Sequence, residues 1–230
     1  MSRPVARGAA TRNANMAIRR DRILDSARSI IAESGFEALS LRDLAHRAQV
    51  TVPTIYNLIG NKAAVVAQLF NDTLTPFEHL QYINDRDDPV GSPERFFDTL
   101  IASLGENEHY HRAEFLAREH MREAGDELAI SIHERVVQIA IEACEQARNA
   151  GLIKGSISAR QLGEQIDHHV RLAFYDWAHG SIDLSTFKRR LLVGTYLCLA
   201  ADAHNNYHEE FVKKIRQHDA HSHLIHFEKS

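Results

Sequence analysis

Apolar residues recur every three or four positions along most of this chain, and no segment shows the strict alternation of a half-buried strand. The pattern predicts an all-helical protein. The first helix carries apolar residues from Ile23 to Ile31 and ends at Gly35, because glycine favours a helix stop. Ser40 precedes Asp43 with the spacing of an N-terminal capping box, and this predicts the start of a second helix.

A third helix is predicted from Thr51, because threonine caps helix N-termini and the first turn tolerates Pro53. This helix is barely two turns long and ends at Gly60. A fourth helix begins at Asn61, with Lys62 in its first turn. A helix as short as the third is unstable alone in water, so a surrounding core has to hold it.

Five further helices are predicted in the rest of the chain, which gives about nine in total. The first of them is expected to start near residue 92, the second to cover residues 112–122 and the third to end at residue 151. The last two are expected to run over residues 158–179 and 184–217. The predicted fold is all-α, with an N-terminal three-helix domain of the helix-turn-helix kind and a C-terminal helical domain.

Only residues 49–51 separate the second helix from the third, which is typical of a helix-turn-helix unit whose last helix lies in the DNA major groove. Ile55, Leu58 and Ile59 supply the back face of the short helix. Its opposite face offers hydrogen-bonding groups and a small apolar wedge, which suit base edges, thymine methyls and phosphates. The candidates for DNA contact there are Thr51, Pro53, Thr54, Tyr56 and Asn57.

The net charge of −4 conceals an asymmetry. Residues 1–62 hold ten Lys or Arg and five Asp or Glu, so they carry +5 and the other 168 residues carry −9. This distribution favours contact of the N-terminal part with a polyanion. Lys62 agrees, because a lysine at a helix N-terminus is favourable if a phosphate lies beside it. A solvated lysine and an arginine-rich tail without a role are the alternatives.

Residues 22–69 resemble the N-terminal domain of the tetracycline-repressor (TetR) family. The motifs that carry the resemblance are Arg22–Ala27, Gly35–Phe36, Leu41–Ala45, Val50–Thr51, Pro53–Tyr56 and Asn61–Lys62. The resemblance implies that Tyr56 and Lys62 hold phosphates. It also implies that Arg42, Thr54 and Asn57 lie at or near bases.

The chain departs from the family pattern at two positions. Gln49 stands where a glycine is usual in the turn, so the turn has to form without a residue that adopts positive φ easily. Ile59 stands where an aromatic residue is usual, and it fills less of the core. Neither departure changes the predicted fold.

For the C-terminal part, the resemblance implies a small-molecule site and a homodimer formed through the last two helices. The run Leu191–Ala201 is apolar almost all round its helix, which therefore needs cover on several sides, from a partner or within a monomeric bundle. The dimer-interface candidates are Gly194, Leu197, Ala200 and Ala201. The ligand-pocket candidates are Phe96, Leu100, Phe115, His120, His168, Leu172 and Tyr175.

The 15 histidines raise the alternative of metal binding. His204 and His208 have a spacing that can chelate a metal, and further histidines crowd the C-terminus. A complete zinc-protease motif, a glycine-rich phosphate loop and a nucleophile elbow are all missing. We therefore predict no metal, no cofactor and no enzymatic activity. Cys144 and Cys198 are interpreted as free thiols in a reducing cytoplasm.

These patterns predict a disordered basic arm (1–16), a DNA-binding domain (17–64), a ligand-binding and dimerisation domain (65–218) and a His-rich tail (219–230). The longest apolar run, 11 residues, is too short for a membrane span, so a cytoplasmic protein is expected. The predicted function is a transcriptional regulator, most simply a repressor that a small-molecule effector releases from a palindromic operator in double-stranded DNA. Two alternatives stay open: the same dimer regulated by a metal or another signal, and a helical metal- or protein-binding module that does not bind DNA.

Overall fold

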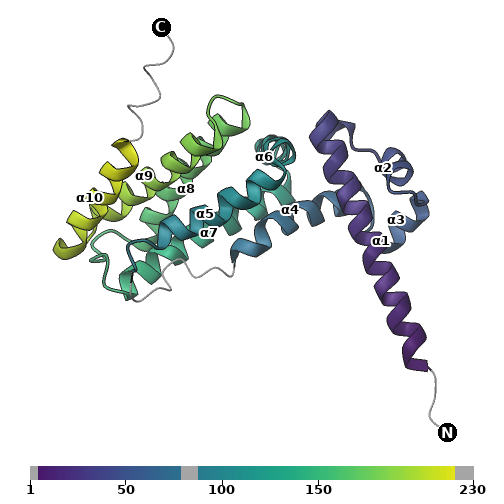
Figure 1. The fold of residues 1–230 in the computed structure, drawn as a ribbon, viewed down its shortest axis with the longest axis horizontal. Helices are drawn as coiled ribbons and strands as arrows, with labels where there is room; N and C mark the ends of the chain where they lie inside the picture. Colours follow the sequence, from purple (N-terminus) through teal and green to yellow (C-terminus); the bar gives the residue numbers. More distant parts are fainter. Residues whose placement is uncertain (1–4, 79–87, 221–230) are drawn as a thin grey trace. The chain divides into compact units, whose positions relative to one another are not determined.

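The computed structural model describes residues 5–78 and 88–220, and within these ranges every regular element is helical apart from one bridge between Ile153 and Ala203 (Figure 1). The all-α prediction is therefore confirmed. The elements are α1 (Val5–Ser34), the 3-10 helix η1 (Phe36–Ala38), α2 (Leu41–Arg47), α3 (Val52–Leu58), α4 (Lys62–Glu78), α5 (Ser92–Glu106), α6 (Glu108–Glu123), α7 (Glu127–Asn149), α8 (Ala159–Ala178), α9 (Leu184–Ala201) and α10 (Asn205–Ala220).

The helices form two compact units. The N-terminal unit comprises the chain up to Thr73 together with His109–Ala117, and the C-terminal unit comprises the remainder. The sequence placed the boundary after residue 64, but α4 groups with the N-terminal unit as far as Thr73, over about two thirds of its length. The physical reason is packing, because Phe70 of α4 is buried and stacks on Phe36 with ring centroids 6.3 Å apart.

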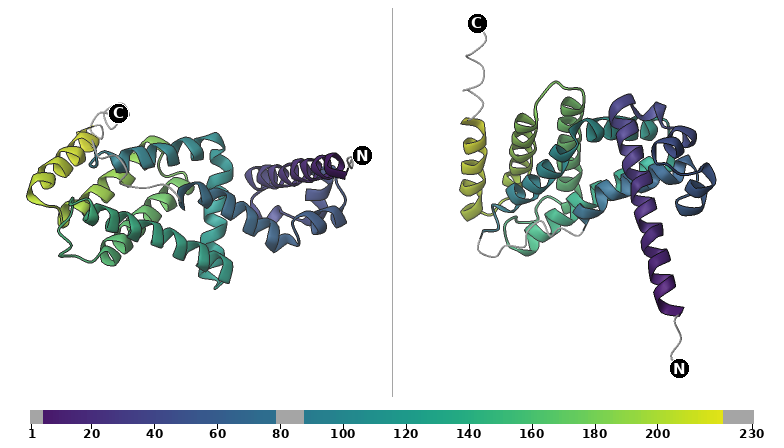
Figure 2. Two further views of the ribbon diagram at one scale, coloured as in Figure 1. Left: turned by 90° about the horizontal axis from the view of Figure 1, so that it is seen from below. Right: turned by 45° about the vertical axis from the view of Figure 1, so that its right-hand side comes forward.

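In the N-terminal unit, α1 packs against η1, α2 and α3, and α2 packs against α3 (Figure 2). The centre of this core is fully buried: Ile23, Leu44, Ala48 and Ile55 expose no surface. Ile55 thus supplies the back face predicted for the short helix α3. Leu58 and Ile59 are half-buried.

The predicted helix starts are present. The side chain of Ser40 accepts a hydrogen bond from Asp43 N (3.1 Å), and that of Thr51 accepts one from Thr54 N (3.3 Å). These caps satisfy backbone donors that the first turn of a helix leaves without a partner. The turn between α2 and α3 is therefore bounded at its C-terminal side by Thr51, a cap that the sequence already identified.

Helix α1 begins at Val5, inside the segment predicted to be a disordered arm. Residues 5–20 are rich in alanine and arginine, contain one glycine and lack proline, and such a composition favours helix. The prediction relied on apolar periodicity, which starts only later in this helix. At the other end, the predicted tail lies outside the described residues from position 221 onward.

In the C-terminal unit, α8 lies between α7 and α9, and α9 also packs against α5 and α10 (Figure 1). Aromatic side chains fill its centre, where Trp177 stacks on Phe187 with ring centroids 5.2 Å apart. Gly194 of α9 leaves room for a side chain of α8, since a Cβ at this position would lie 1.9 Å from the ring of His169. The contact between Gly194 and His169 is made within one chain.

The single helix predicted over residues 184–217 is broken into α9 and α10 at Asp202. The carboxylate of Asp202 is buried and accepts hydrogen bonds from Gly155 N (2.7 Å) and Ser156 N (3.1 Å). Its backbone oxygen also accepts from Lys154 N (2.7 Å). The loop between α7 and α8 is thereby tied to the end of α9, a contact across more than 40 positions that local periodicity does not reveal.

Candidate nucleic-acid interface

The turn between α2 and α3 is closed by backbone hydrogen bonds. Ala48 N donates to Leu44 O (2.8 Å), and Val50 N donates to Ala45 O (2.9 Å). Gln49 lies between them with φ +52°, in the left-handed region that side chains disfavour. A glutamine therefore adopts the conformation to which glycine is better suited.

Helix α3 has one buried and one exposed face. Ile55 points into the core, whereas its neighbour Tyr56 is 54% exposed. The half-buried Thr54 shares a hydrogen bond of 2.9 Å with Thr51, so both hydroxyls are oriented at the N-terminal end of the helix. The other outward residues that the sequence proposed, Thr51, Pro53 and Asn57, are exposed. The structure thus brings the candidates on α3 together on one face.

The two arginines of α2 differ in their surroundings. Arg47 makes a two-pronged ion pair with Glu33, with both distances 2.7 Å. The hydrogen bonds and charge of Arg47 hold the pKa of Glu33 below its ordinary value. Arg42 lies in the first turn of α2 and is exposed. Of this pair, Arg42 is therefore the cation available to an incoming polyanion.

Lys62 opens α4 and is half-buried, with its Nζ 5.7 Å from the centre of the Phe36 ring. The negative face of an aromatic ring attracts a cation at this range, so the lysine side chain is held against η1. Asn61 caps the same helix by accepting a hydrogen bond from Ala64 N (2.9 Å). A cation beside the positive end of a helix dipole is unfavourable alone, and a neighbouring anion would relieve that cost.

Helix α1 contributes a group that the sequence reasoning missed. Arg22 is exposed, and its Nη2 donates to the backbone oxygen of Gln49 at 3.4 Å. A guanidinium of α1 thus lies beside the turn that precedes α3. Of the arginines at helical spacing from Arg22, Arg12 lay in the segment predicted to be disordered, and a disordered segment has no helical face on which to align them.

The predicted pocket residues differ in burial. Phe115 of α6 is buried, whereas Phe96 and Leu100 of α5 are half-buried. Leu172 is 63% exposed. Tyr175 donates a hydrogen bond to Glu123 (3.1 Å). The remaining two candidates, His120 and His168, are exposed.

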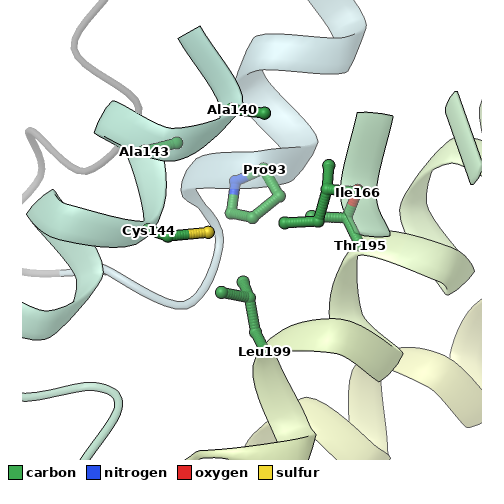
Figure 3. Close-up of a pocket in the computed structure, with 7 residues that line it drawn as sticks. All are labelled: Pro93, Ala140, Ala143, Cys144, Ile166, Thr195 and Leu199. Carbon is green, nitrogen blue, oxygen red and sulfur yellow. The ribbon is translucent and has the colours of Figure 1, made fainter. Parts of the chain in front are cut away.

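A small cavity of about 20 Å³ lies between α5, α7, α8 and α9 (Figure 3). Its lining residues are Pro93, Ala140, Ala143, Cys144, Ile166, Thr195 and Leu199. Thr195 is 3% exposed, and its hydroxyl has no hydrogen-bond partner among the described residues. Burial raises the pKa of the Cys144 thiol to about 12, so this thiol stays neutral. The cavity has room for about one water molecule, far less than a small organic ligand needs.

A larger open groove of about 450 Å³ runs between α7 and α8. His168 lines it, as do His133 and Asp167, whose nearest side-chain N and O atoms are 3.8 Å apart. Burial raises the pKa of Asp167 and lowers the pKa of His133. Its volume is in the range of small-molecule sites.

The four predicted dimer-interface residues lie on different sides of α9. Gly194 and Ala200 are buried within the chain, whereas Ala201 is exposed and Leu197 is 55% exposed. Leu172 of the adjacent helix α8 is also exposed. The neighbouring helices α8 and α9 therefore each expose one large apolar side chain to water.

The histidine pair proposed as a chelator is divided between elements. His204 precedes α10, and Nδ1 of His208 lies 3.1 Å from the backbone oxygen of Ala200. In residues 5–78 and 88–220, no three His, Cys, Asp or Glu side chains are grouped so as to hold a metal ion. None of the helices in these ranges is both long and apolar enough to cross a membrane.

Residues 23–69 match the family of bacterial regulatory proteins, tetR family. A curated relative, the uncharacterized HTH-type transcriptional regulator YdeS of Bacillus subtilis (strain 168), is 42% identical over 53 residues, which are 23% of this chain and 27% of the relative. The chain thus aligns with only about a quarter of that protein.

Solved structures share the fold over most of the chain. SmeT, the repressor of the Stenotrophomonas maltophilia multidrug efflux pump SmeDEF, has a TM-score of 0.66 at 20% identity and covers 82% of this chain and 92% of its own. A SmeT–triclosan complex has a TM-score of 0.61 at 19% identity, over 83% and 94%. NalD, the secondary repressor of the MexAB-OprM multidrug efflux pump in Pseudomonas aeruginosa, has a TM-score of 0.61 at 22% identity, over 80% and 96%. The family match and the curated relative thus cover only the N-terminal part of the chain, and the likeness of the remainder to SmeT and NalD is one of fold.

Proposed function

We propose that this protein is a sequence-specific DNA-binding transcriptional regulator, in the simplest case a repressor. The observation that carries the proposal is the outward face of α3, where hydroxyl, amide and phenol groups project from a helix whose other face is anchored by Ile55. The family match over residues 23–69 supports it, as do the similar proteins, which are repressors or a transcriptional regulator.

Each residue has a distinct role in this proposal. Arg42, Thr54 and Asn57 read base edges in the major groove, since guanidinium, hydroxyl and amide groups match the donors and acceptors there. Tyr56 and Lys62 hold phosphates on either side and thereby fix the register of α3. Thr51 and Pro53 lie at the N-terminal end of α3, where Thr51 orients Thr54 through their shared hydrogen bond.

We further propose that the protein acts as a homodimer through α8 and α9. The exposure of Leu172 and Leu197 on neighbouring helices supports this surface, because apolar area in contact with water favours burial against a second copy. Two-fold symmetry also suits a helix-turn-helix protein, which then reads two half-sites about 34–36 Å apart in a palindromic operator.

A small-molecule effector that releases the operator completes the proposal. The SmeT–triclosan complex supports an organic ligand, and the groove between α7 and α8 is large enough to accept one. Helices α4 and α6 each contribute residues to both units, so either helix offers a covalent route for a signal. Within the N-terminal unit, Arg28 of α1 forms an ion pair with Asp72 of α4 (2.7 Å). On α6, burial of His111 and the nearby charge of Arg28 lower the pKa of His111 to about 4.

The deciding experiment selects, from random duplexes, those that the purified full-length protein retains. The expected result is a single palindromic motif. Thr54→Ala and Arg42→Ala should then change the selected motif, since each base contact accounts for about 1–3 kcal/mol of discrimination. Arg216→Ala, an exposed arginine of α10, is the matched control and should leave the motif unchanged. A wild-type protein that enriches no motif would refute the proposed function.

A further inference from the structure

Helix α1 carries a row of polar residues that the three-helix core does not use. Positions 12, 15, 19 and 22 are spaced by three, four and three residues, so they share one face of the helix. We name this row the arginine stripe, and its members are Arg12, Asn15, Arg19 and Arg22. Asn15, Arg19 and Arg22 are exposed.

One end of the arginine stripe lies beside the turn between α2 and α3. Its last member, Arg22, donates to the backbone oxygen of Gln49, the residue that shapes the turn before α3. From there the stripe runs toward the N-terminus, and ten residues of helix cover about 15 Å. Within the N-terminal unit, Figure 2 shows the N-terminal half of α1 projecting past α2 and α3. The stripe is therefore continuous with the proposed DNA-reading surface.

The first half of α1 is electrostatically unfavourable in the isolated protein. Residues 5–20 hold four arginines and no acidic residue. Cations near a helix N-terminus oppose the helix dipole, and like charges spaced along one helix repel each other. Burial does not compensate, because residues 14–19 are all exposed. A polyanion along this half of the helix would remove both penalties.

We propose that the arginine stripe binds the phosphate backbone of the duplex beside the base pairs that α3 reads. This inference rests on the DNA-binding function proposed above and adds a second contact surface to it. Guanidinium groups bind phosphate through paired hydrogen bonds, and the Asn15 amide can donate another. Phosphate contacts carry no base identity, so the stripe raises affinity without changing the preferred sequence. At about 3.4 Å per base-pair step, 15 Å of helix extends the footprint by about four base pairs.

The test compares two double variants of the full-length protein on the selected duplex. Arg12→Gln with Arg19→Gln removes two stripe charges, and Arg148→Gln with Arg216→Gln removes two exposed charges from the C-terminal unit. Binding is measured between 50 and 200 mM KCl. In a dimer, the first variant should flatten the slope of log affinity against log salt by about three to four, at about 0.9 for each phosphate that is no longer neutralised. The second should keep the wild-type slope. A wild-type slope in the stripe variant, or equal flattening in both variants, overturns the proposal.

Two further measurements locate the contact. Trimming about four base pairs from each flank should bring the wild type and the stripe variant to the same affinity. Amide hydrogen exchange over residues 5–18 should slow when the intact duplex is added, because the helix is then neutralised along its length. Unchanged exchange, or a stripe variant that loses binding to phosphatidylserine vesicles but not to DNA, would refute the assignment to DNA. If the wild type selects a motif and the stripe variant matches it in every respect, the stripe proposal fails alone; if the wild type binds no duplex, the proposed function itself fails.

Discussion

Replacing Gln49 by glycine should stabilise the helix-turn-helix unit. Gln49 has φ +52°, and its exposed side chain makes no hydrogen bond among those observed for the described residues. Its backbone oxygen accepts from Arg22, and this hydrogen bond does not depend on the side chain of residue 49. The substitution therefore changes the backbone cost of the turn and little else.

The magnitude follows from two opposing costs. A left-handed conformation costs a non-glycine residue about 1–2 kcal/mol. Glycine avoids this cost but loses about 0.5–1 kcal/mol more conformational entropy on folding. The net gain is about 0.5–1 kcal/mol, which at 25 °C slows local amide exchange about two- to fivefold when opening is the limiting equilibrium.

The assay has to report on the N-terminal unit. The single tryptophan, Trp177, lies in the C-terminal unit, so its fluorescence does not serve. Hydrogen exchange of peptides that span residues 44–59 reads the local free energy of opening instead. We expect protection to rank Gly above Asn, Asn above the wild type and Ala, and these above Val, because asparagine tolerates positive φ and β-branched residues do not. If the amides of the Gln49→Gly variant were no better protected than those of the Gln49→Ala variant, the reasoning would be refuted.

Four further tests address other parts of the structure. Lys62→Ala should weaken binding to all duplexes about equally and flatten the salt slope by about one unit for each phosphate that Lys62 neutralises, whereas an unchanged slope excludes a phosphate contact. Leu172→Glu with Leu197→Glu should convert the dimer to a folded monomer in light scattering, and a variant that stays dimeric would place the interface elsewhere. Gly194→Ala should reduce the free energy of unfolding by about 1–3 kcal/mol, because the added methyl group overpacks against His169. A second substitution, His169→Ala, should restore most of this loss, and no restoration would mean that the contact is unimportant. Asp202→Asn should reduce the free energy of unfolding by about 1.5–3 kcal/mol in denaturant titration followed by tryptophan fluorescence, and an unchanged midpoint would show that its hydrogen bonds to the loop between α7 and α8 contribute little.

The sequence sufficed for features that depend on near neighbours. The caps at Ser40 and Thr51 lie three residues from the N–H groups they accept, and the inward position of Ile55 follows from helical spacing around a short helix. Exposure of Tyr56 follows from the same geometry, because adjacent residues on a helix point about 100° apart. The outward face of α3 could be chosen for the same reason, before any tertiary contact was known.

Features that depend on distant residues could not be read in this way. The break between α9 and α10 follows from Asp202 binding a loop more than 40 positions earlier, although the segment itself has continuous helical periodicity. Phe115 was assigned to a pocket by its type, and its burial depends on how α6 packs. Leu172 illustrates the limit most clearly, because an apolar residue on an amphipathic helix suits a core, a pocket and an interface equally well.

One principle connects the turn, the arginine stripe and Lys62. Local rules are broken at each: Gln49 adopts a conformation suited to glycine, α1 begins with arginines, and α4 begins with a lysine. Conflicts between local preference and structure cluster where function imposes its own requirements. All three lie in the N-terminal unit, and the two that involve charge are relieved by the same kind of partner, a polyanion. A proposal that places DNA along this surface therefore accounts for two separate electrostatic penalties with one ligand, which a role for the cations in solubility alone does not explain.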